Sequence, residues 1–224
     1  MVKAIVFDFD GVITMRGEGL KEEAWEILAG NIDTEEAGKT EEFINKLRFY
    51  RGEYGQGKGK GSRYDILEKS LESVFGYVGE KLKNKVSFYS AVYDKSVQAM
   101  ILDDGLLPDT REALKELSDN FPLYVNSASP EEAVRFSIKK LGLGDFFKGV
   151  YGQPSSKTEN LQRVAEREGI TDAKDIVFVG DSNGDEEAAR QFGCRFIGFA
   201  NDWNLWKDKT FPLISHLKEI KKHL

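Results

Sequence analysis

The feature that most constrains the fold is a regular alternation of two kinds of segment between residues 109 and 200. Short apolar runs, rich in β-branched and aromatic residues, alternate with longer stretches in which apolar residues recur every three or four positions. This alternation predicts an α/β fold, with a Rossmann-like parallel sheet and helices on both faces. The expected strands are Phe121–Asn126, Lys148–Gly152, Asp175–Gly180 and Arg195–Ala200, and the expected helices are Asp109–Ser118, Pro130–Leu141, Thr158–Glu168 and Gly184–Phe192.

The N-terminal part of the chain interrupts this pattern. Lys3–Phe9 is a further apolar run without helical period and is expected to be the first buried strand. From residue 16 to residue 98 every periodic segment is helical, and no strand pattern separates them. We therefore expect a discontinuous α/β core domain, 1–15 and 99–224, with a small α-helical domain, 16–98, inserted into it. The expected helices of the insertion are Leu20–Ala29, Thr34–Tyr50, Tyr64–Phe75 and Glu80–Met100.

Composition excludes several classes of protein. The 224 residues carry 32 Lys and Arg against 38 Asp and Glu, a formal net charge of −6, which argues against a protein held to nucleic acid by overall basicity. No apolar run approaches the roughly 20 residues of a membrane-spanning helix, and no basic segment precedes an apolar stretch at the N-terminus. We expect a cytoplasmic protein that binds neither nucleic acid nor membrane.

The scarcity of cysteine and histidine limits the chemistry further. Cys194 is the only cysteine, and the two histidines, His216 and His223, lie among the last nine residues. An internal disulfide and a cysteine-rich zinc site are excluded, and a Ser-His-Asp triad would have to recruit the C-terminal tail. Catalysis would therefore rest on carboxylates, lysine or arginine, hydroxyl groups and a hard metal ion.

Two acidic residues end the first expected strand. Asp8 and Asp10 are two positions apart, so in an extended chain both side chains point to the same side. Two carboxylates so close together need a cation or a shared proton. The alternative interpretation is a strand that simply runs into an Asp-Gly turn at Gly11.

A second pair of acids follows the strand Asp175–Gly180. Asp181 and Asp185 lie in the turn between this strand and the next expected helix, where they could also serve only to cap the helix. Together with Asp8 and Asp10 they would place four carboxylates at one edge of the sheet. A cluster of oxygen ligands of this kind is suited to Mg²⁺.

Ser127 and Lys157 each follow the end of another expected strand. A hydroxyl group and an ammonium group are what the oxygens of a phosphoryl group require while negative charge is being transferred. Taken singly, Ser127 could be a helix cap or turn hydroxyl and Lys157 a solvated surface lysine. Their positions after separate strands favour the phosphate-binding interpretation.

Four motifs in this order resemble the haloacid dehalogenase (HAD) superfamily of phosphohydrolases: Asp8-x-Asp10-Gly11, then Ser127, then Lys157, then Gly180-Asp181-x-x-x-Asp185. The resemblance extends from residue 3 to about residue 200. The helical insertion resembles the C1-type cap domain that follows the nucleophile strand in that family. The resemblance implies that Asp8 is the nucleophile and Asp10 the general acid and base. It also implies that Ser127 and Lys157 bind the phosphoryl group, and that Asp8, the main-chain carbonyl of Asp10, Asp181 and Asp185 bind Mg²⁺.

The expected function is that of a Mg²⁺-dependent phosphatase, which hydrolyses a small phosphorylated metabolite, a phosphate monoester, through an aspartyl-phosphate. A second possibility is a phosphomutase or phosphotransferase of the β-phosphoglucomutase type, in which a sugar hydroxyl replaces water as the acceptor. A non-catalytic binding protein with the same fold is disfavoured by the intact acids, Ser127 and Lys157.

The inserted domain contains a basic, glycine-rich segment. Residues 46–63 carry six basic side chains against the single acid Glu53. The segment is not a P-loop, because Gly59 stands where Ser or Thr is required and no strand precedes it. We consider it a flexible linker, with binding of a second anionic group of the substrate as the alternative. The residues proposed for that alternative are Arg51, Lys58, Lys60 and Arg63.

Overall fold

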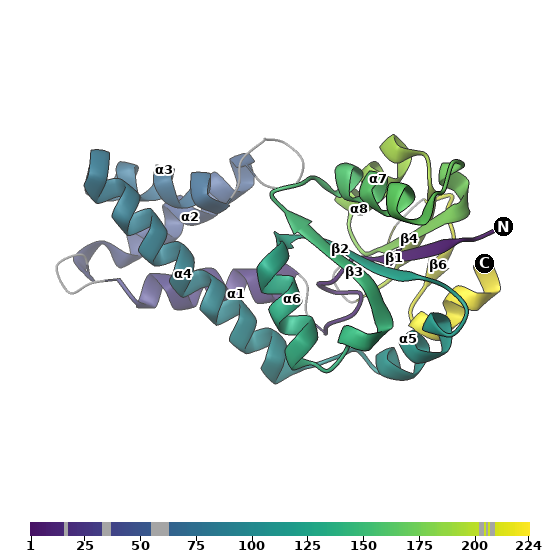
Figure 1. The fold of residues 1–224 in the computed structure, drawn as a ribbon. Helices are drawn as coiled ribbons and strands as arrows, with labels where there is room; N and C mark the ends of the chain where they lie inside the picture. Colours follow the sequence, from purple (N-terminus) through teal and green to yellow (C-terminus); the bar gives the residue numbers. More distant parts are fainter. Residues whose placement is uncertain (16–17, 33–36, 55–62, 202–203, 205, 207–208) are drawn as a thin grey trace. The chain divides into compact units, whose positions relative to one another are not determined.

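The computed structural model describes residues 1–15, 18–32, 37–54, 63–201, 204, 206 and 209–224. The chain divides into two compact units (Figure 1). One consists of Met1–Glu18 and Ile101–Leu224, and the other of Gly19–Met100. Each unit has its own secondary structure and its own apolar core, so we describe them one after the other.

The first unit is built on a six-stranded parallel sheet with the order β3-β2-β1-β4-β5-β6. The central strand β1 has four apolar residues that are all buried, as expected for a strand covered on both faces. Figure 1 shows α7 and α8 on one side of the sheet and α5 on the other. The strands are β1 (Ala4–Phe7), β2 (Leu123–Pro130), β3 (Phe147–Gln153), β4 (Ile176–Gly180), β5 (Arg195–Phe199) and β6 (Leu213–Ile214). The helices are α5 (Thr110–Ser118), α6 (Glu131–Lys140), α7 (Lys157–Glu168) and α8 (Asn183–Phe192), with short 3-10 turns at Gly144–Phe146, Ala173–Asp175 and Leu217–His223.

The expected α/β fold is confirmed, and the differences from the sequence prediction are local. The strand β2 begins at Leu123 instead of Phe121 and continues to Pro130. The strand β6 and the 3-10 turn Leu217–His223 were not predicted. Two residues are too short for a period-two pattern, and Leu213–Ile214 becomes a strand only because β5 lies beside it.

The register of the sheet brings the end of β1, the end of β4 and the middle of β2 to the same level. Phe7 of β1 is paired with Val125 of β2 on one side and with Val179 of β4 on the other. The residues after these three positions are Asp8, Asn126 and Gly180. The carboxyl edge of the sheet therefore assembles, from three distant parts of the chain, the segments on which the sequence analysis placed its motifs.

The second unit is helical throughout its described residues. It contains α1 (Glu18–Gly30), the 3-10 turn Ala37–Lys39, α2 (Thr40–Tyr54), α3 (Arg63–Phe75) and α4 (Gly79–Asp104), of which α1 begins just before the unit and α4 ends just beyond it. Its core is a cluster of buried apolar residues that includes Trp25, Phe43, Leu67, Leu71 and Tyr89. The predicted helix start at Thr34 lies outside the described residues. That this unit is a cap remains a prediction.

No described helix combines the length and the apolar character of a membrane span, even though α4 has 26 residues.

Candidate active site

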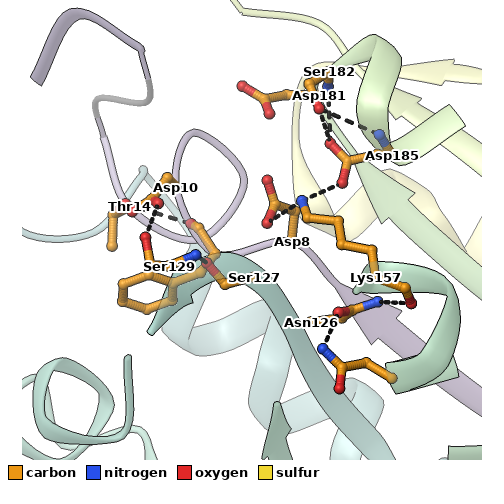
Figure 2. Close-up of polar contacts among 12 residues, drawn as sticks. Asp8, Asp10, Thr14, Asn126, Ser127, Ser129, Lys157, Asp181, Ser182 and Asp185 are labelled. Atoms are coloured by element: carbon orange, nitrogen blue, oxygen red, sulfur yellow. Dashed lines mark hydrogen bonds and ion pairs between the residues drawn. The ribbon is translucent and has the colours of Figure 1, made fainter. Parts of the chain in front are cut away.

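Asp8 lies at the carboxyl end of β1 and is only 6% exposed. Its main-chain N–H donates to the carbonyl of Val179 at 2.8 Å, which extends the pairing of β1 with β4 by one residue. The Nζ atom of Lys157 lies 2.8 Å from Oδ1 of Asp8 and 2.5 Å from Oδ1 of Asp185 (Figure 2). One ammonium group therefore links two carboxylates that belong to different strand ends.

Lys157 owes its position to the start of α7. Ser156 caps this helix and forms a capping box with Glu159, so Lys157 is the first helical residue. The main-chain carbonyl of Lys157 accepts a hydrogen bond from Nδ2 of Asn126 at 2.8 Å, and Oδ1 of Asn126 accepts one from Nδ2 of Asn160 at 3.0 Å. Both asparagines are fully buried. They tie the start of α7 to the end of β2, and Lys157 is not a solvated surface lysine.

Asp185 is both a helix cap and a member of the site. Its Oδ2 atom accepts hydrogen bonds from the main-chain N–H of Ser182 at 3.0 Å and from the hydroxyl of Ser182 at 2.5 Å, while its Oδ1 atom contacts Lys157. A side chain at Gly180 would place its Cβ 2.3 Å from Cβ of Asp185, so glycine is required there. For Asp185, helix capping and membership of the acidic cluster are therefore compatible.

Three of the four predicted carboxylates form a cluster. Asp8, Asp181 and Asp185 each offer an oxygen atom, and these atoms all lie within 4.8 Å of one another. The Asp10 side chain does not belong to this group. Its Oδ2 atom accepts a hydrogen bond from the hydroxyl of Ser129 at 3.2 Å, so the acid lies beside the cluster and is held by β2 (Figure 2).

The charges of the carboxylate cluster favour binding of a cation. Burial, followed by the neighbouring Asp185, raises the pKa of Asp8 well above its ordinary value, and Lys157 only partly opposes this shift. Burial tends to lower the pKa of Lys157, but Asp185 and Asp8 outweigh it and raise that pKa. Three buried carboxylates offer oxygen atoms within 4.8 Å of one another, and Lys157 contacts two of them, Asp8 and Asp185. A set of negatively charged oxygen donors is suited to a divalent cation such as Mg²⁺.

Ser127 lies one residue beyond the level of Asp8, near the end of β2, and is 1% exposed. Its hydroxyl oxygen accepts a hydrogen bond from the main-chain N–H of Ser129 at 3.0 Å, as in a serine turn. It does not cap α6, whose N-cap residue is Pro130. The turn bond occupies a lone pair and not the hydroxyl hydrogen, which suits donation to a phosphoryl oxygen.

Several residues of this site were not predicted. Ser129 contacts Asp10, Asn160 supports Lys157 through Asn126, and Asn201 donates to Oδ2 of Asp181 at 2.8 Å. Asn160 could have been recognised from the sequence, because it is a polar residue on the apolar side of a predicted helix. Asn201 lies just after the last expected strand, where no helix or strand was predicted.

Of the basic residues proposed to bind a second anionic group, the two that the structure describes have acidic partners. Arg51 forms an ion pair with Glu22, and Nη1 of Arg63 lies 2.6 Å from Oδ1 of Asp94. Lys58 and Lys60 lie outside the described residues. The anion-binding alternative for this segment stays a prediction, and for Arg51 and Arg63 it would require exchange of an existing partner.

Comparison with known proteins agrees with the fold and shows the family. The family model of haloacid dehalogenase-like hydrolases matches residues 2–193. A phosphoglycolate phosphatase of Pectobacterium atrosepticum is 30% identical over 117 residues, which cover 49% of this chain and 50% of that protein. The chain spans about half the length of the curated relatives it matches.

Solved structures extend the likeness over the whole fold. The putative HAD-hydrolase YfnB from Bacillus subtilis, bound to magnesium, has a TM-score of 0.70 at 16% identity and covers 100% of this chain and 98% of its own. A putative β-phosphoglucomutase from Thermotoga maritima has a TM-score of 0.69 at 19% identity and covers 100% of both chains.

The structure is that of an α/β protein with a buried acidic cluster and a lysine at the carboxyl edge of its parallel sheet. The chain belongs to the haloacid dehalogenase-like hydrolases.

Proposed function

We propose that this protein is a Mg²⁺-dependent phosphatase, which hydrolyses the monoester of a small phosphorylated metabolite through an aspartyl-phosphate on Asp8. The observation that carries the proposal is the Asp8 carboxylate itself. It is buried at the end of the central strand, paired with Lys157 at 2.8 Å and close to two further carboxylates. A carboxylate in this setting has a cationic neighbour that can offset its repulsion by an incoming phosphate dianion.

The proposed reaction uses two carboxylates in two steps. An Oδ atom of Asp8 attacks phosphorus, the bond from phosphorus to the ester oxygen breaks, and Asp10 gives its proton to the departing alcohol. Asp10 then takes a proton from water, whose oxygen attacks phosphorus. The bond to Asp8 breaks, which releases phosphate, restores the Asp8 carboxylate and leaves Asp10 protonated as at the start. Ser127 and Lys157 would bind the phosphoryl oxygens throughout.

The acidic cluster would hold the metal ion. Asp8, Asp181 and Asp185, together with the main-chain carbonyl of Asp10, are the groups proposed to bind Mg²⁺. When bound, the ion supplies positive charge that stabilises the negative charge of the transferring phosphoryl group. The Ser129 hydrogen bond would hold the Asp10 carboxylate outside the metal cluster, where it can exchange protons.

The substrate that we propose to test first is a small phosphorylated acid, phosphoglycolate. The support is the identity of this chain to several phosphoglycolate phosphatases over about half their length. We further propose that the helical unit, residues 16–98, is a cap domain on the core domain formed by 1–15 and 99–224. A cap would limit the site to small molecules and exclude bulk water.

The phosphomutase alternative uses the same Asp8 and Asp10 chemistry with a sugar hydroxyl as acceptor. The likeness to β-phosphoglucomutase structures supports the shared fold and not the shared reaction. A phosphatase releases inorganic phosphate without any added acceptor, whereas a mutase requires a sugar phosphate to receive the group.

The experiment is a phosphate-release assay over phosphoglycolate, other small phosphorylated acids, sugar phosphates and nucleotides, with Mg²⁺ or EDTA. We expect release from phosphoglycolate or another small ester with Mg²⁺ only, and none from the Asp8→Asn variant. Activity that survives EDTA would contradict the metal assignment. Activity that survives in Asp8→Asn would contradict the nucleophile.

A further inference from the structure

The segment after β5 reaches the acidic cluster through two asparagines. Nδ2 of Asn201 donates to Oδ2 of Asp181 at 2.8 Å and also lies 3.4 Å from the main-chain carbonyl of Gly11. Nδ2 of Asn204 donates to the main-chain carbonyl of Asp181. Asp181 is thus held at its side chain and its main chain by residues about twenty positions further along the sequence.

The two asparagines are themselves held by hydrogen bonds in the core unit. The main-chain N–H of Asn204 donates to Oδ1 of Asn201 at 3.0 Å, and that of Trp206 donates to Oδ1 of Asn204 at 3.1 Å. The indole of Trp206 is 4% exposed and donates to the carbonyl of Phe199, the last residue of β5, at 2.8 Å. The two amide groups are therefore fixed in orientation, because each Oδ1 atom is used by the turn and each Nδ2 atom faces Asp181.

The Asp181 carboxylate has little room to take another position. Gly11 has φ +81°, and a Cβ atom there would lie 2.3 Å from Oδ2 of Asp181. Asn201 therefore contacts the two motifs that carry the acids, the turn after β1 and the turn after β4. An amide is also a neutral donor, so it orients the carboxylate and leaves its negative charge in place. A lysine would orient the carboxylate but also cancel that charge.

We propose that Asn201, with Asn204, is a positioning residue that holds Asp181 in the orientation of a metal ligand. The inference rests on the proposed function, since it assumes that the cluster binds a divalent cation. Partners that orient a metal-binding carboxylate usually change metal affinity by 10–100-fold when they are removed. We expect a change of that size.

The test measures the dissociation constant of Mn²⁺ alone, by the electron paramagnetic resonance signal of free Mn²⁺, well below the melting temperature of every variant. Asn201→Ala removes the amide. Asn201→Ser keeps an oxygen that can accept the Asn204 N–H but cannot reach Asp181. The matched control is Asn120→Ala, because Asn120 is an exposed asparagine before β2, where its amide donates to the carbonyl of Glu116.

We expect both Asn201 variants to bind Mn²⁺ 10–100-fold more weakly than the wild type, and Asn120→Ala to bind it normally. The melting temperature of Asn201→Ser in EDTA should equal that of the wild type. In an Asp181→Asn background, Asn201→Ala should weaken binding no further, because its effect passes through Asp181.

Wild-type Mn²⁺ affinity in both Asn201 variants would overturn the inference while leaving the proposed function intact. An equal further loss in the Asp181→Asn background would also overturn it, because Asn201 would then act independently of Asp181. A wild-type protein that binds no Mn²⁺ would instead refute the metal site, and with it both proposals.

Discussion

Lys157 and Asp8 form a buried ion pair with Nζ 2.8 Å from Oδ1, although 149 positions separate them in the sequence. Loss of the lysine would leave the carboxylates of the cluster without their cation. Breaking a buried pair by removing one partner costs roughly 3–5 kcal/mol. We expect Lys157→Met to lower the free energy of unfolding by about that amount in EDTA at pH 8, as measured by urea denaturation, and to abolish phosphate release. An unchanged free energy of unfolding would show that the Lys157–Asp8 ion pair does not stabilise the folded protein.

Because the pKa of Asp8 is raised, we expect a substitution that removes its charge to stabilise the folded protein. Burial and Asp185 raise this pKa in the folded state, so the ionised carboxylate opposes folding. This cost is complete above the folded-state pKa, shrinks as the pH falls below it, and disappears near the ordinary pKa of the unfolded chain. Because Lys157 keeps Asp185 as a partner when Asp8 loses its charge, Asp8→Asn should be more stable than the wild type in EDTA at pH 8. The advantage should shrink towards pH 4 and when Mg²⁺ is added. Parallel denaturation curves at both pH values check it, and a pH-independent difference would contradict it.

The buried pair Asn126 and Asn160 supports the main chain of Lys157, so we expect its loss to lower both the stability and the activity of the protein. Asn160→Leu leaves Oδ1 of Asn126 without its donor, at a cost of about 1–3 kcal/mol in the free energy of unfolding. We expect kcat to fall as well, because Asn126 also donates to the main-chain carbonyl of Lys157. The double variant with Asn126→Leu should cost less than the sum of the single variants. Strict additivity would show that the two asparagines act separately.

Gly11 should be required for more than its backbone conformation. Gly11→Ala combines a left-handed φ of +81° with a Cβ atom 2.3 Å from Asp181, so it should weaken Mn²⁺ binding as well as stability. The matched control is Gly193→Ala, with φ +90° and its nearest neighbour at 3.8 Å, which should cost only the roughly 1–2 kcal/mol of the backbone strain. Equal Mn²⁺ affinities in the two variants would argue against close packing of Gly11 on Asp181.

The positions of the main candidate residues could be predicted because each lies at or after the predicted end of a strand. Asp8 and Asp181 come directly after β1 and β4, and Ser127 follows the predicted end of β2, although the strand itself continues to Pro130. The parallel register then brings the three residues to within one position of a common level. Lys157 was found in the same way, after β3. Local sequence rules suffice for such residues, since only the strand and its turn need to be recognised.

The residues that orient these groups could not be predicted in this way. Asn160 meets Asn126 across 34 positions and Asn201 meets Asp181 across 20, and neither contact leaves a local pattern. Ser129 meets Asp10 only because β2 continues past its predicted end. Contacts of this kind depend on how α7 and the segment after β5 pack on the sheet, which a single sequence does not specify.

The central claim is that Asp8 becomes phosphorylated during turnover. The direct measurement is to mix the enzyme with Mg²⁺ and its best substrate, quench it with acid, reduce it with borohydride and sequence the peptides by mass spectrometry. An aspartyl-phosphate is reduced to homoserine, so we expect homoserine at position 8, with more in Asp10→Asn, which should hydrolyse the intermediate more slowly. Steady release of phosphate with unmodified Asp8, or with the modification at another residue, would contradict the account.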